Sequence, residues 1–395
     1  MGLPLKDVRV LDLSVFVSGP FGTMILGDLG AEVIKIEMPG SGVPGRHVPP
    51  YFVDGESSYF ISMNRNKKSL TLNLKTDQGR EIFYELVKHS DVVLDNFRPG
   101  VTDRLGITYD TLKEINPRII VCSITGFGST GPAKDMPAFD LIIQARGGIM
   151  SYTGEPDRKP VKMGSPIGDL AGALYAVNGI LAALYQRKET GRGQRVDISM
   201  LDCQLALHIY RAQNYFVGGA IPTPLGTGHT SINPLGTFPT KTFDVVIDCN
   251  TQKIFNDMCA AMGHPEMGTD PRFNTLEHRL NNKEVLNAWV REMFLKYTGE
   301  ELLELLQNRI PIAPINTIDK AFEEPQPLSR NMVVKIDYAS RKDLRIVGNP
   351  IKLSEVDKEV FKIPPRLSED TAQILADLLH YSPEKIAQLR QEEII

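Results

Sequence analysis

The stretch VRVLDLSVFVSGPFGTMILGDLGAEVIKIE, residues 8–37, decides the fold class of this 395-residue protein. Its apolar run at 8–13 predicts a strand, and the turn at 18–20 predicts a helix from about Phe21, because proline is common at the first helical positions. The helix should end at Leu29-Gly30, and residues 31–37 are typical of a second strand. Strand, helix and strand within about 30 residues predict a βαβ unit and therefore a parallel sheet.

The same pattern recurs along the first half of the chain. We expect strands at 69–74, 91–95 and 118–124, and helices at 78–88, 170–187 and about 195–216. Such alternation favours a doubly wound α/β domain.

Glycine and proline crowd the chain beyond residue 218, so we place a domain boundary there. A smaller α+β region should follow, with helices at 283–297 and 299–308, then a linker at 325–330 and terminal helices at 371–380 and 383–391. The expected organisation is 1–217 as the large domain, 218–330 as the small domain with its linkers, and 331–395 as a return to the large domain.

The composition of the chain excludes several classes of binding partner. A formal net charge of −4 gives no bulk attraction to nucleic acid or to an anionic membrane. The start of the chain shows no signal-peptide pattern, and the longest uncharged run, 170–186, is shorter than the ~20 residues that span a bilayer. The four cysteines form no CxxC pair and the seven histidines no ligand spacing. We therefore expect a cytoplasmic protein without a metal, a nucleic-acid partner or a membrane partner.

Asp169 stands at the head of the uncharged run, after Gly164, Pro166 and Gly168. We expect this helix to be buried and the carboxylate to be poorly hydrated. Such a carboxylate is either a helix N-cap, which satisfies free N–H groups, or a nucleophile. The local spacing leaves both readings open.

Other polar groups follow predicted strands, where α/β sheets bind ligands. The turn at 17–22 is either a plain connection or a ligand contact through bare N–H groups. The basic cluster 65–68 is either a ligand site or a solvated surface. Arg98 and Arg104 suit phosphate, and Phe97 suits stacking on a base. The glycine-rich loop at 126–131 is followed by Lys134, Phe139 and Asp140.

Taken together, these motifs resemble the class III coenzyme A transferases, a family that includes formyl-CoA transferase, carnitine CoA-transferase and alpha-methylacyl-CoA racemase. The resemblance covers nearly the whole chain, and the order of its motifs is specific. It rests on the stretches 8–13, 18–21, 28–37, 64–69, 96–100, 124–128, 168–170 and 190–197.

The resemblance implies a Rossmann-like large domain with a parallel sheet, a smaller α+β domain, and two chains interlocked as rings in a homodimer. It implies no tightly bound cofactor, since the coenzyme A thioester is a substrate. The family's catalytic aspartate falls on Asp169, which would form an aspartyl anhydride and then aspartyl-CoA. Glycine backbone near Gly164, Gly168 and 226–228 would admit the acyl groups and stabilise an oxyanion.

Matching positions transfer the family's CoA contacts to this chain. The expected contacts are Val17, Ser18, Leu72, Lys75, Asn96, Phe97, Arg98 and Arg104. Met38 stands where many relatives have arginine, so Lys35, Lys67 or Lys134 would have to replace that cation. Phe139 stands where some relatives have tyrosine, and Asp140 keeps the acidic residue that follows.

The resemblance also suggests the substrates. The loop with Gly226, Gly228 and His229 is similar to enzymes that pass CoA between small dicarboxylic acids, so we expect an acyl-CoA donor such as succinyl-CoA and a free carboxylic acid acceptor. His229 would contact a distal carboxylate or simply pack in its loop.

Three alternatives remain. A 2-methylacyl-CoA racemase would need a histidine at Phe139, which cannot transfer a proton. A non-catalytic CoA-binding protein would use Asp169 only as a cap. A nicotinamide dehydrogenase would need the GxGxxG motif, which the chain lacks.

Overall fold

The computed structural model describes residues 2–395 and divides into two compact units. The first unit contains residues 2–149, 163–212 and 325–395, and the second contains 150–162 and 213–324. Residues 150–162, which we expected in the large domain, thus belong to the second unit. The chain leaves the first unit twice and returns to it from residue 325 onward.

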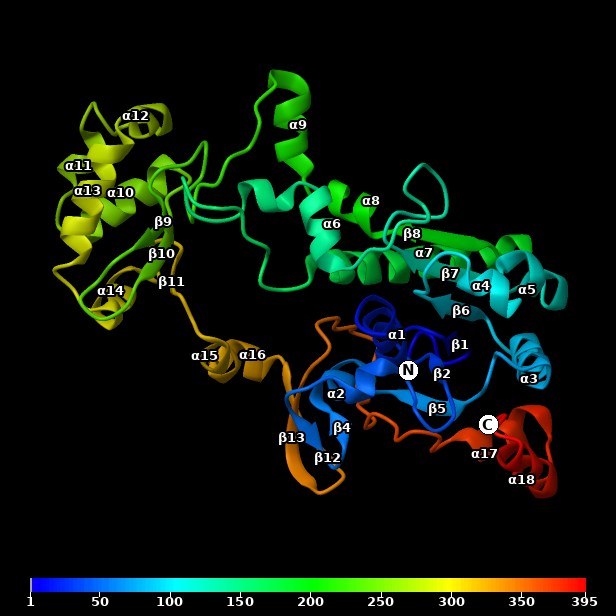
Figure 1. The fold of residues 1–395 in the computed structure, drawn as a ribbon. Coiled ribbons are helices and arrows are strands. Elements are labelled where there is room, and N and C mark those ends of the chain that lie inside the picture. Colours follow the sequence, from blue (N-terminus) through cyan, green and yellow to red (C-terminus); the bar gives the residue numbers. More distant parts are fainter. Residues whose placement is uncertain (1) are drawn as a thin grey trace. The chain divides into compact units, whose positions relative to one another are not determined.

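A six-stranded parallel sheet forms the centre of the first unit, as the sequence predicted (Figure 1). Its strands, in spatial order, are β5 (Lys67–Thr71), β2 (Glu32–Glu37), β1 (Arg9–Asp12), β6 (Val92–Asp95), β7 (Ile120–Thr125) and β8 (Arg195–Ser199). The strand order reverses between β1 and β6, and α1 (Ser18–Asp28) connects β1 to β2. Doubly wound sheets bind ligands where the order reverses, so the loops after β1 and β6 are the first place to look for a site.

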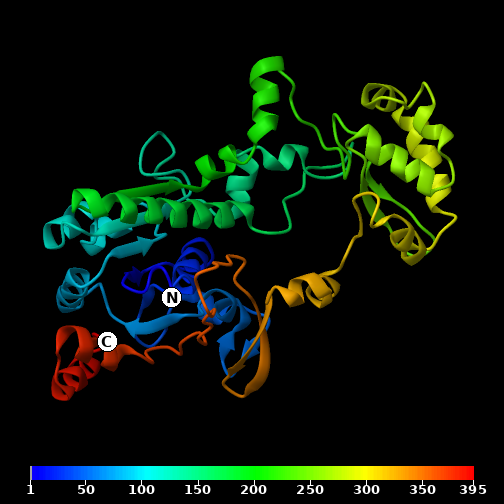
Figure 2. The same ribbon diagram turned by 180° about the vertical axis from the view of Figure 1, so that it is seen from behind.

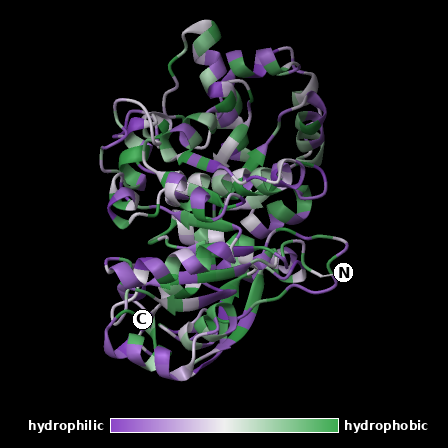
Figure 3. Cartoon of the chain, turned by 90° about the vertical axis from the view of Figure 1, so that its right-hand side faces the viewer, coloured by the Kyte–Doolittle hydropathy of each residue, from purple (hydrophilic) through white to green (hydrophobic). Residues whose placement is uncertain are grey.

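Helices cover both faces of this sheet, as the view from behind also shows (Figure 2). On one face, Val10, Leu94 and Ile124 pack against α1 and α7 (Ile167–Thr190). On the other face, the core includes side chains from α3 (Asp77–Lys88), α5 (Tyr109–Ile115), α17 (Thr371–Leu379) and α18 (Pro383–Gln391). Hydrophobic residues accordingly line the strands (green in Figure 3).

Three expectations about helices were wrong. Residues 195–199 form strand β8, because the β-branched Val196 and Ile198 pair with β7, and the helices there are α8 (Met200–Ala206) and α9 (Ile209–Gly218). The expected linker at 325–330 contains the short helix α16 (Pro325–Ser329). The uncharged helix α7 is buried on one face only.

Helix α7 is long and apolar enough to cross a membrane by length and composition alone. Its inner face, with Ala176 and Ile180 fully buried, instead packs into the core beside the sheet. Its outer face exposes Leu174, Tyr175 and Tyr185.

The returning segment is fastened to the N-terminal part of the first unit by buried charges. Arg65 forms a bidentate pair with Asp28, at 2.9 and 2.6 Å, and donates to the Val347 carbonyl at 2.7 Å. Arg46 pairs with Glu37 at 2.7 Å and donates to the Pro365 carbonyl. Arg65 and Lys67 are therefore buried and are neither the solvated charges nor the ligand contacts that we considered. Lys68 is partly exposed and pairs with Glu32 at 2.6 Å.

The second unit has its own antiparallel sheet, β11-β10-β9, and its own core. These strands are β9 (Leu235–Phe238), β10 (Val245–Asp248) and β11 (Ile312–Pro314). The helices of this unit that follow β10 are α10 (Gln252–Ala261), α11 (Glu266–Thr269), α12 (Leu276–Asn281), α13 (Lys283–Phe294), α14 (Gly299–Leu306) and α15 (Ile318–Glu323).

Smaller elements complete the first unit. They are β3 (Phe52–Val53), β4 (Glu56–Ser57), α2 (Ser58–Met63), α4 (Val101–Leu105), α6 (Asp140–Arg146), β12 (Val333–Tyr338), β13 (Arg341–Val347) and a 3-10 turn at Pro44–His47; another lies at Ile149–Tyr152, across the boundary of the units.

Candidate active site

Asp169 lies in the first turn of α7 and is half-buried. The helix begins at Ile167 and its N-cap is Pro166, so Asp169 is the third helical residue. The N-cap reading of this carboxylate was therefore wrong. The side chain still lies at the helix N-terminus, where the macrodipole favours a negative charge.

Burial raises the pKa of Asp169 to about 6, and the charge of Asp140 adds to the rise. A hydrogen bond from the Ser18 side chain opposes both effects. At pH 7 the carboxylate is therefore mostly ionised although its surroundings hydrate it poorly. This combination suits a nucleophile better than a structural acid.

Asp140, the first residue of α6, fixes the start of α7. Its Oδ1 accepts the Gly168 backbone N–H at 2.8 Å, and its Oδ2 accepts the Gln144 side-chain amide at 2.7 Å. A Cβ on Gly168 would lie 3.1 Å from that Oδ1, so glycine permits the close approach. Because Asp140 occupies the Gly168 N–H, this group is not free to stabilise an oxyanion as we had expected.

Ser18 and Asn96 connect Asp169 to the point where the strand order reverses. The Asn96 amide donates to Ser18 Oγ at 3.1 Å and to the Val15 carbonyl at 2.7 Å, and its Oδ1 accepts the Val15 N–H at 2.8 Å. Asn96 follows β6, and Val15, Val17 and Ser18 follow β1. The structure thus brings Val17, Ser18 and Asn96, three of the expected contacts, to the Asp169 side of the sheet.

One aromatic residue lies near this carboxylate, and an aromatic pair joins the segments next to Ser18 and Asp140. Tyr59 on α2 lies close enough that burial, with the charge of Asp169, raises its pKa to about 12. Phe16 and Phe139 form an edge-to-face pair with ring centroids 6.2 Å apart, and both rings are partly exposed. The sequence analysis missed Tyr59 and Phe16, since neither belongs to a spacing pattern that points to Asp169.

A cavity of about 520 Å³ opens beside the same loops. Four expected CoA contacts line it, namely Leu72, Lys75, Phe97 and Arg104. Val15 and Met38 contribute to its apolar wall. Within residues 2–395, neither Lys75 nor Arg104 forms an ion pair. Apolar walls with two unpaired cations suit an adenine ring and the phosphates attached to it.

Met38 lies in this cavity wall, but two of the lysines expected to compensate for it do not. Lys35 and Lys67 are buried at Asp12, 3.6 and 3.0 Å from its Oδ2. Their ammonium groups therefore cannot reach a ligand. Lys134 is exposed and lines a different cavity.

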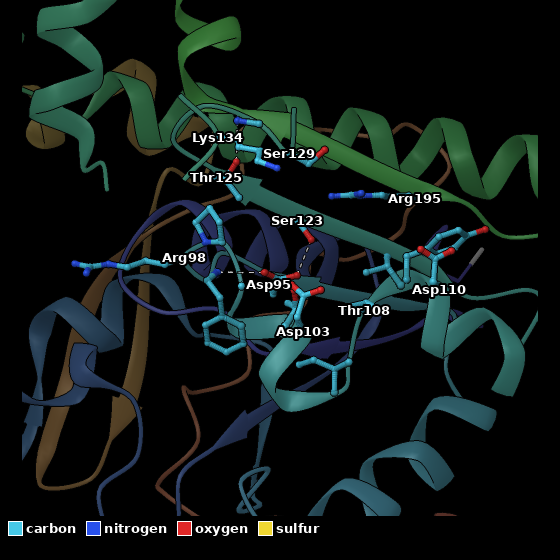
Figure 4. Close-up of a pocket in the computed structure, with 18 of the residues that line it drawn as sticks. Asp95, Arg98, Asp103, Thr108, Asp110, Ser123, Thr125, Ser129, Lys134 and Arg195 are labelled. Atoms are coloured by element: carbon cyan, nitrogen blue, oxygen red, sulfur yellow. Dashed lines mark hydrogen bonds between the residues drawn. The ribbon is translucent and has the colours of Figure 1, made fainter. Parts of the chain in front are cut away.

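That second cavity, of about 310 Å³, contains Arg98 and Lys134 together with Phe97 (Figure 4). Asp95 lies at its base, accepting hydrogen bonds from Ser123 Oγ at 2.7 Å and the Phe97 N–H at 3.1 Å, and burial raises the pKa of Asp95 to about 6. Figure 4 shows the Arg98 side chain extending away from Asp95. Phe97 lines both cavities, so it joins the two groups of expected contacts.

Gly226, Gly228 and His229 lie in the second unit. The Gly226 N–H donates to Gly154 O and the Gly228 N–H to Leu225 O, both at 2.9 Å, so these donors are engaged. Nδ1 of His229 accepts the Ser231 N–H at 3.1 Å. These contacts describe a closed loop rather than an oxyanion hole.

The family model for CoA-transferase family III matches residues 5–371. The chain is 40% identical to acetyl-CoA:oxalate CoA-transferase of Acetobacter aceti over 356 residues, 90% of each protein. It is 36% identical to succinyl-CoA:glutarate CoA-transferase of Homo sapiens over 393 residues, 99% of this chain and 90% of that one. A crystal structure of a CAIB/BAIF family protein from Brucella suis superposes with a TM-score of 0.86 at 36% identity, covering 96% of this chain and all of the other. The chain therefore belongs to CoA-transferase family III and is a class III CoA-transferase.

Proposed function

We propose that the protein moves CoA from succinyl-CoA to a small dicarboxylic acid through covalent intermediates on Asp169. The observation that best supports this proposal is the half-buried, ionised carboxylate of Asp169, which lies beside Ser18 where the strand order reverses. Relatives that resemble this chain include succinyl-CoA:glutarate, succinyl-CoA:mesaconate and succinyl-CoA–D-citramalate CoA-transferases, which support the choice of donor and acceptor class.

The chemistry balances without an external proton donor. A carboxylate oxygen of Asp169 attacks the thioester carbonyl, the C–S bond breaks, and CoA leaves as thiolate from a mixed anhydride. The thiolate attacks the Asp169 carbonyl, which releases the donor acid and leaves aspartyl-CoA. The acceptor carboxylate then attacks this thioester, and the returning thiolate attacks the acceptor carbonyl to restore Asp169.

The surroundings favour the first step. Poor hydration leaves the Asp169 carboxylate more reactive toward a carbonyl carbon. The nucleotide of CoA would occupy the 520 Å³ cavity. Phe97 would stack on the adenine ring, and Lys75 and Arg104 would contact the phosphates. Binding this distant part of CoA would hold the thiolate near the anhydride until it attacks.

Trapping the intermediate tests the covalent mechanism. The protein is mixed with succinyl-CoA and hydroxylamine, and the peptide that contains Asp169 is examined by mass spectrometry. We expect a hydroxamate on Asp169, and none in the Asp169→Asn variant. CoA exchange without any modification of Asp169 would overturn the mechanism.

A donor and acceptor panel tests the substrate class. Succinyl-CoA and acetyl-CoA are each paired with oxalate, glutarate, mesaconate and a monocarboxylate, and the CoA esters are read by mass spectrometry. We expect the highest kcat/KM with succinyl-CoA and a dicarboxylate. Deuterium exchange beside the thioester without acyl exchange would instead indicate a racemase, a reading that Phe139 disfavours because its ring cannot carry a proton.

We also propose that the chain forms a homodimer. Helices α6, α7 and α8 pack together in the first unit and expose large apolar side chains, namely Leu141, Ile142, Leu174, Tyr175 and Leu205. Monomeric soluble proteins rarely expose an apolar patch of this kind, and a second copy would cover it. Sedimentation at micromolar concentration should give twice the chain mass, and Leu174→Glu should lower it; a monomeric wild type would overturn the proposal.

A further inference from the structure

A cluster of buried charges lies directly beneath the loop that carries Ser18. Asp12 ends β1, and its Oδ2 lies 3.0 Å from Lys67 Nζ and 3.6 Å from Lys35 Nζ. All three side chains are fully buried. Strands β1, β2 and β5 each contribute one of these residues, so the cluster joins three neighbouring strands at one point.

All but one of the remaining side-chain hydrogen bonds of the cluster go to the segment 14–23; the exception joins Lys67 Nζ to Asn64 Oδ1 at 2.9 Å. Lys35 Nζ donates to the Ser14 carbonyl at 2.8 Å, and Lys67 Nζ donates to the Pro20 carbonyl at 2.9 Å. Asp12 accepts the Ser14 N–H at 2.9 Å and the Thr23 hydroxyl at 2.7 Å. The cluster therefore holds the loop on both sides of Ser18.

This loop has an unusual conformation that needs such support. Phe16 has a φ of 61°, in the left-handed region that a bulky side chain rarely adopts. A Cβ on Gly19 would lie 2.1 Å from the Ser14 Cβ, so the two ends of the loop are in direct contact. Residues in this state persist only where the surrounding structure fixes them, and they concentrate at functional sites.

Buried ion pairs are weak contributors to stability, because desolvation offsets much of their attraction. A cluster that directs nearly all of its remaining side-chain hydrogen bonds to one segment is better explained by what it positions. We propose that Asp12, Lys35 and Lys67 are positioning residues that fix the β1–α1 loop, so that the Ser18 hydroxyl, which accepts the Asn96 amide at 3.1 Å, is placed to donate to Asp169. This inference rests on the proposed function, because it assigns the cluster a role in preparing the nucleophile.

Lys35 is the cluster member that can be removed with least damage. In Lys35→Met, Asp12 keeps Lys67 at 3.0 Å and Glu37 keeps Arg46 at 2.7 Å, so each remaining buried acid retains a cation. The variant loses the bond to the Ser14 carbonyl. Lys68→Met is the control, since Lys68 lies on the neighbouring strand β5 and donates to Glu32 and not to the loop.

The pKa of Asp169 is the readout, because it moves when the Ser18 donor moves. The charged and titratable groups that face Asp169 are Asp140 and Tyr59, and all variants keep both. The rate at which a carbodiimide modifies Asp169 is followed between pH 4.5 and 8 by peptide mass. Burial lowers the pKa of Lys67 to about 7, and every variant keeps this lysine. Ser18→Ala shows how far the pKa of Asp169 shifts when the hydroxyl is lost completely.

We expect the midpoint of modification to rise by about 0.5 to 1 pH unit in Ser18→Ala and to rise in the same direction in Lys35→Met. Lys68→Met should match the wild type. In CoA transfer, Lys35→Met should lower kcat about tenfold while KM for the CoA ester stays within twofold.

An unchanged midpoint in folded Lys35→Met, with a shifted one in Ser18→Ala, would overturn the positioning role. So would an unchanged midpoint in Ser18→Ala, since Ser18 would then not be the donor. Ser14→Ala, which removes only the hydroxyl bond to Asp12, repeats the test if Lys35→Met does not fold. The modification assay needs no turnover, so a wild type that transfers no CoA would count against the proposed function and leave this test readable.

Discussion

The backbone N–H of Gly168 donates to Asp140 Oδ1 at 2.8 Å, which brings a second carboxylate to the residue just before Asp169. The bond fixes the first turn of α7. Burial raises the pKa of Asp169, and the charge of Asp140 raises it further. One side chain therefore both fixes the turn that carries Asp169 and opposes the ionisation of Asp169.

Asp140→Asn should separate these two effects. Asparagine keeps an oxygen for Gly168 but removes the charge, so the pKa of Asp169 should fall from about 6, by about one unit. The acidic limb of kcat/KM against pH should then move to lower pH. Asp377→Asn, which removes an exposed carboxylate on α17, should leave the profile unchanged. An acidic limb that moves upward would contradict this account.

Phe16 should determine which acyl groups reach Asp169. Its ring meets Phe139 edge to face at 6.2 Å, and its φ of 61° is strained. Phe16→Gly and Phe16→Ala should both raise kcat/KM for longer acyl-CoA donors relative to short ones, because each removes the ring. Only glycine relieves the backbone strain, so Phe16→Gly should unfold about 1 kcal/mol less readily than Phe16→Ala. Equal chain-length preferences in wild type and both variants would exclude Phe16 as a wall of the acyl site.

The Arg65–Asp28 pair should stabilise the return of the chain. Arg65→Met leaves Asp28 buried without its bidentate partner and frees the Val347 carbonyl, so we expect a loss of about 3–5 kcal/mol in the free energy of unfolding. Arg272→Ala breaks the exposed pair with Asp270 and should change stability little. Urea unfolding followed by circular dichroism compares the two. Similar midpoints would show that the return segment does not depend on this pair.

Local patterns were enough to predict the βαβ core. The apolar runs of β1 and β2 and the turn at Pro20 are short-range signals, and the sheet followed them. The prediction of a helix at residues 195–199 was wrong. A strand of five residues directly before a helix shows no hydrophobic period of its own, and only its pairing with β7 defines it.

The site was predictable where it follows strand ends and not where it depends on distant partners. Asn96 stands directly after one predicted strand and Ser18 in the turn that follows another, so topology alone brings them together. Lys35 and Lys67 were misjudged because a lysine is normally exposed, and only the three-dimensional structure shows Asp12 between them. Tyr59 was missed because nothing in its own segment points to Asp169.

Met38 gives the sharpest remaining test of the cavity that we assign to the nucleotide. It lies in the wall of the 520 Å³ cavity that Lys75 and Arg104 also line. If phosphates bind there, Met38→Arg should lower KM for the CoA ester about three- to tenfold without changing kcat, and added salt should weaken the gain. Val285→Arg, on the exposed surface of α13, is the control for added charge and should change neither constant. A higher KM in Met38→Arg would mean that the methionine contacts the adenine ring, and the phosphates would then have to lie nearer Arg98 and Lys134.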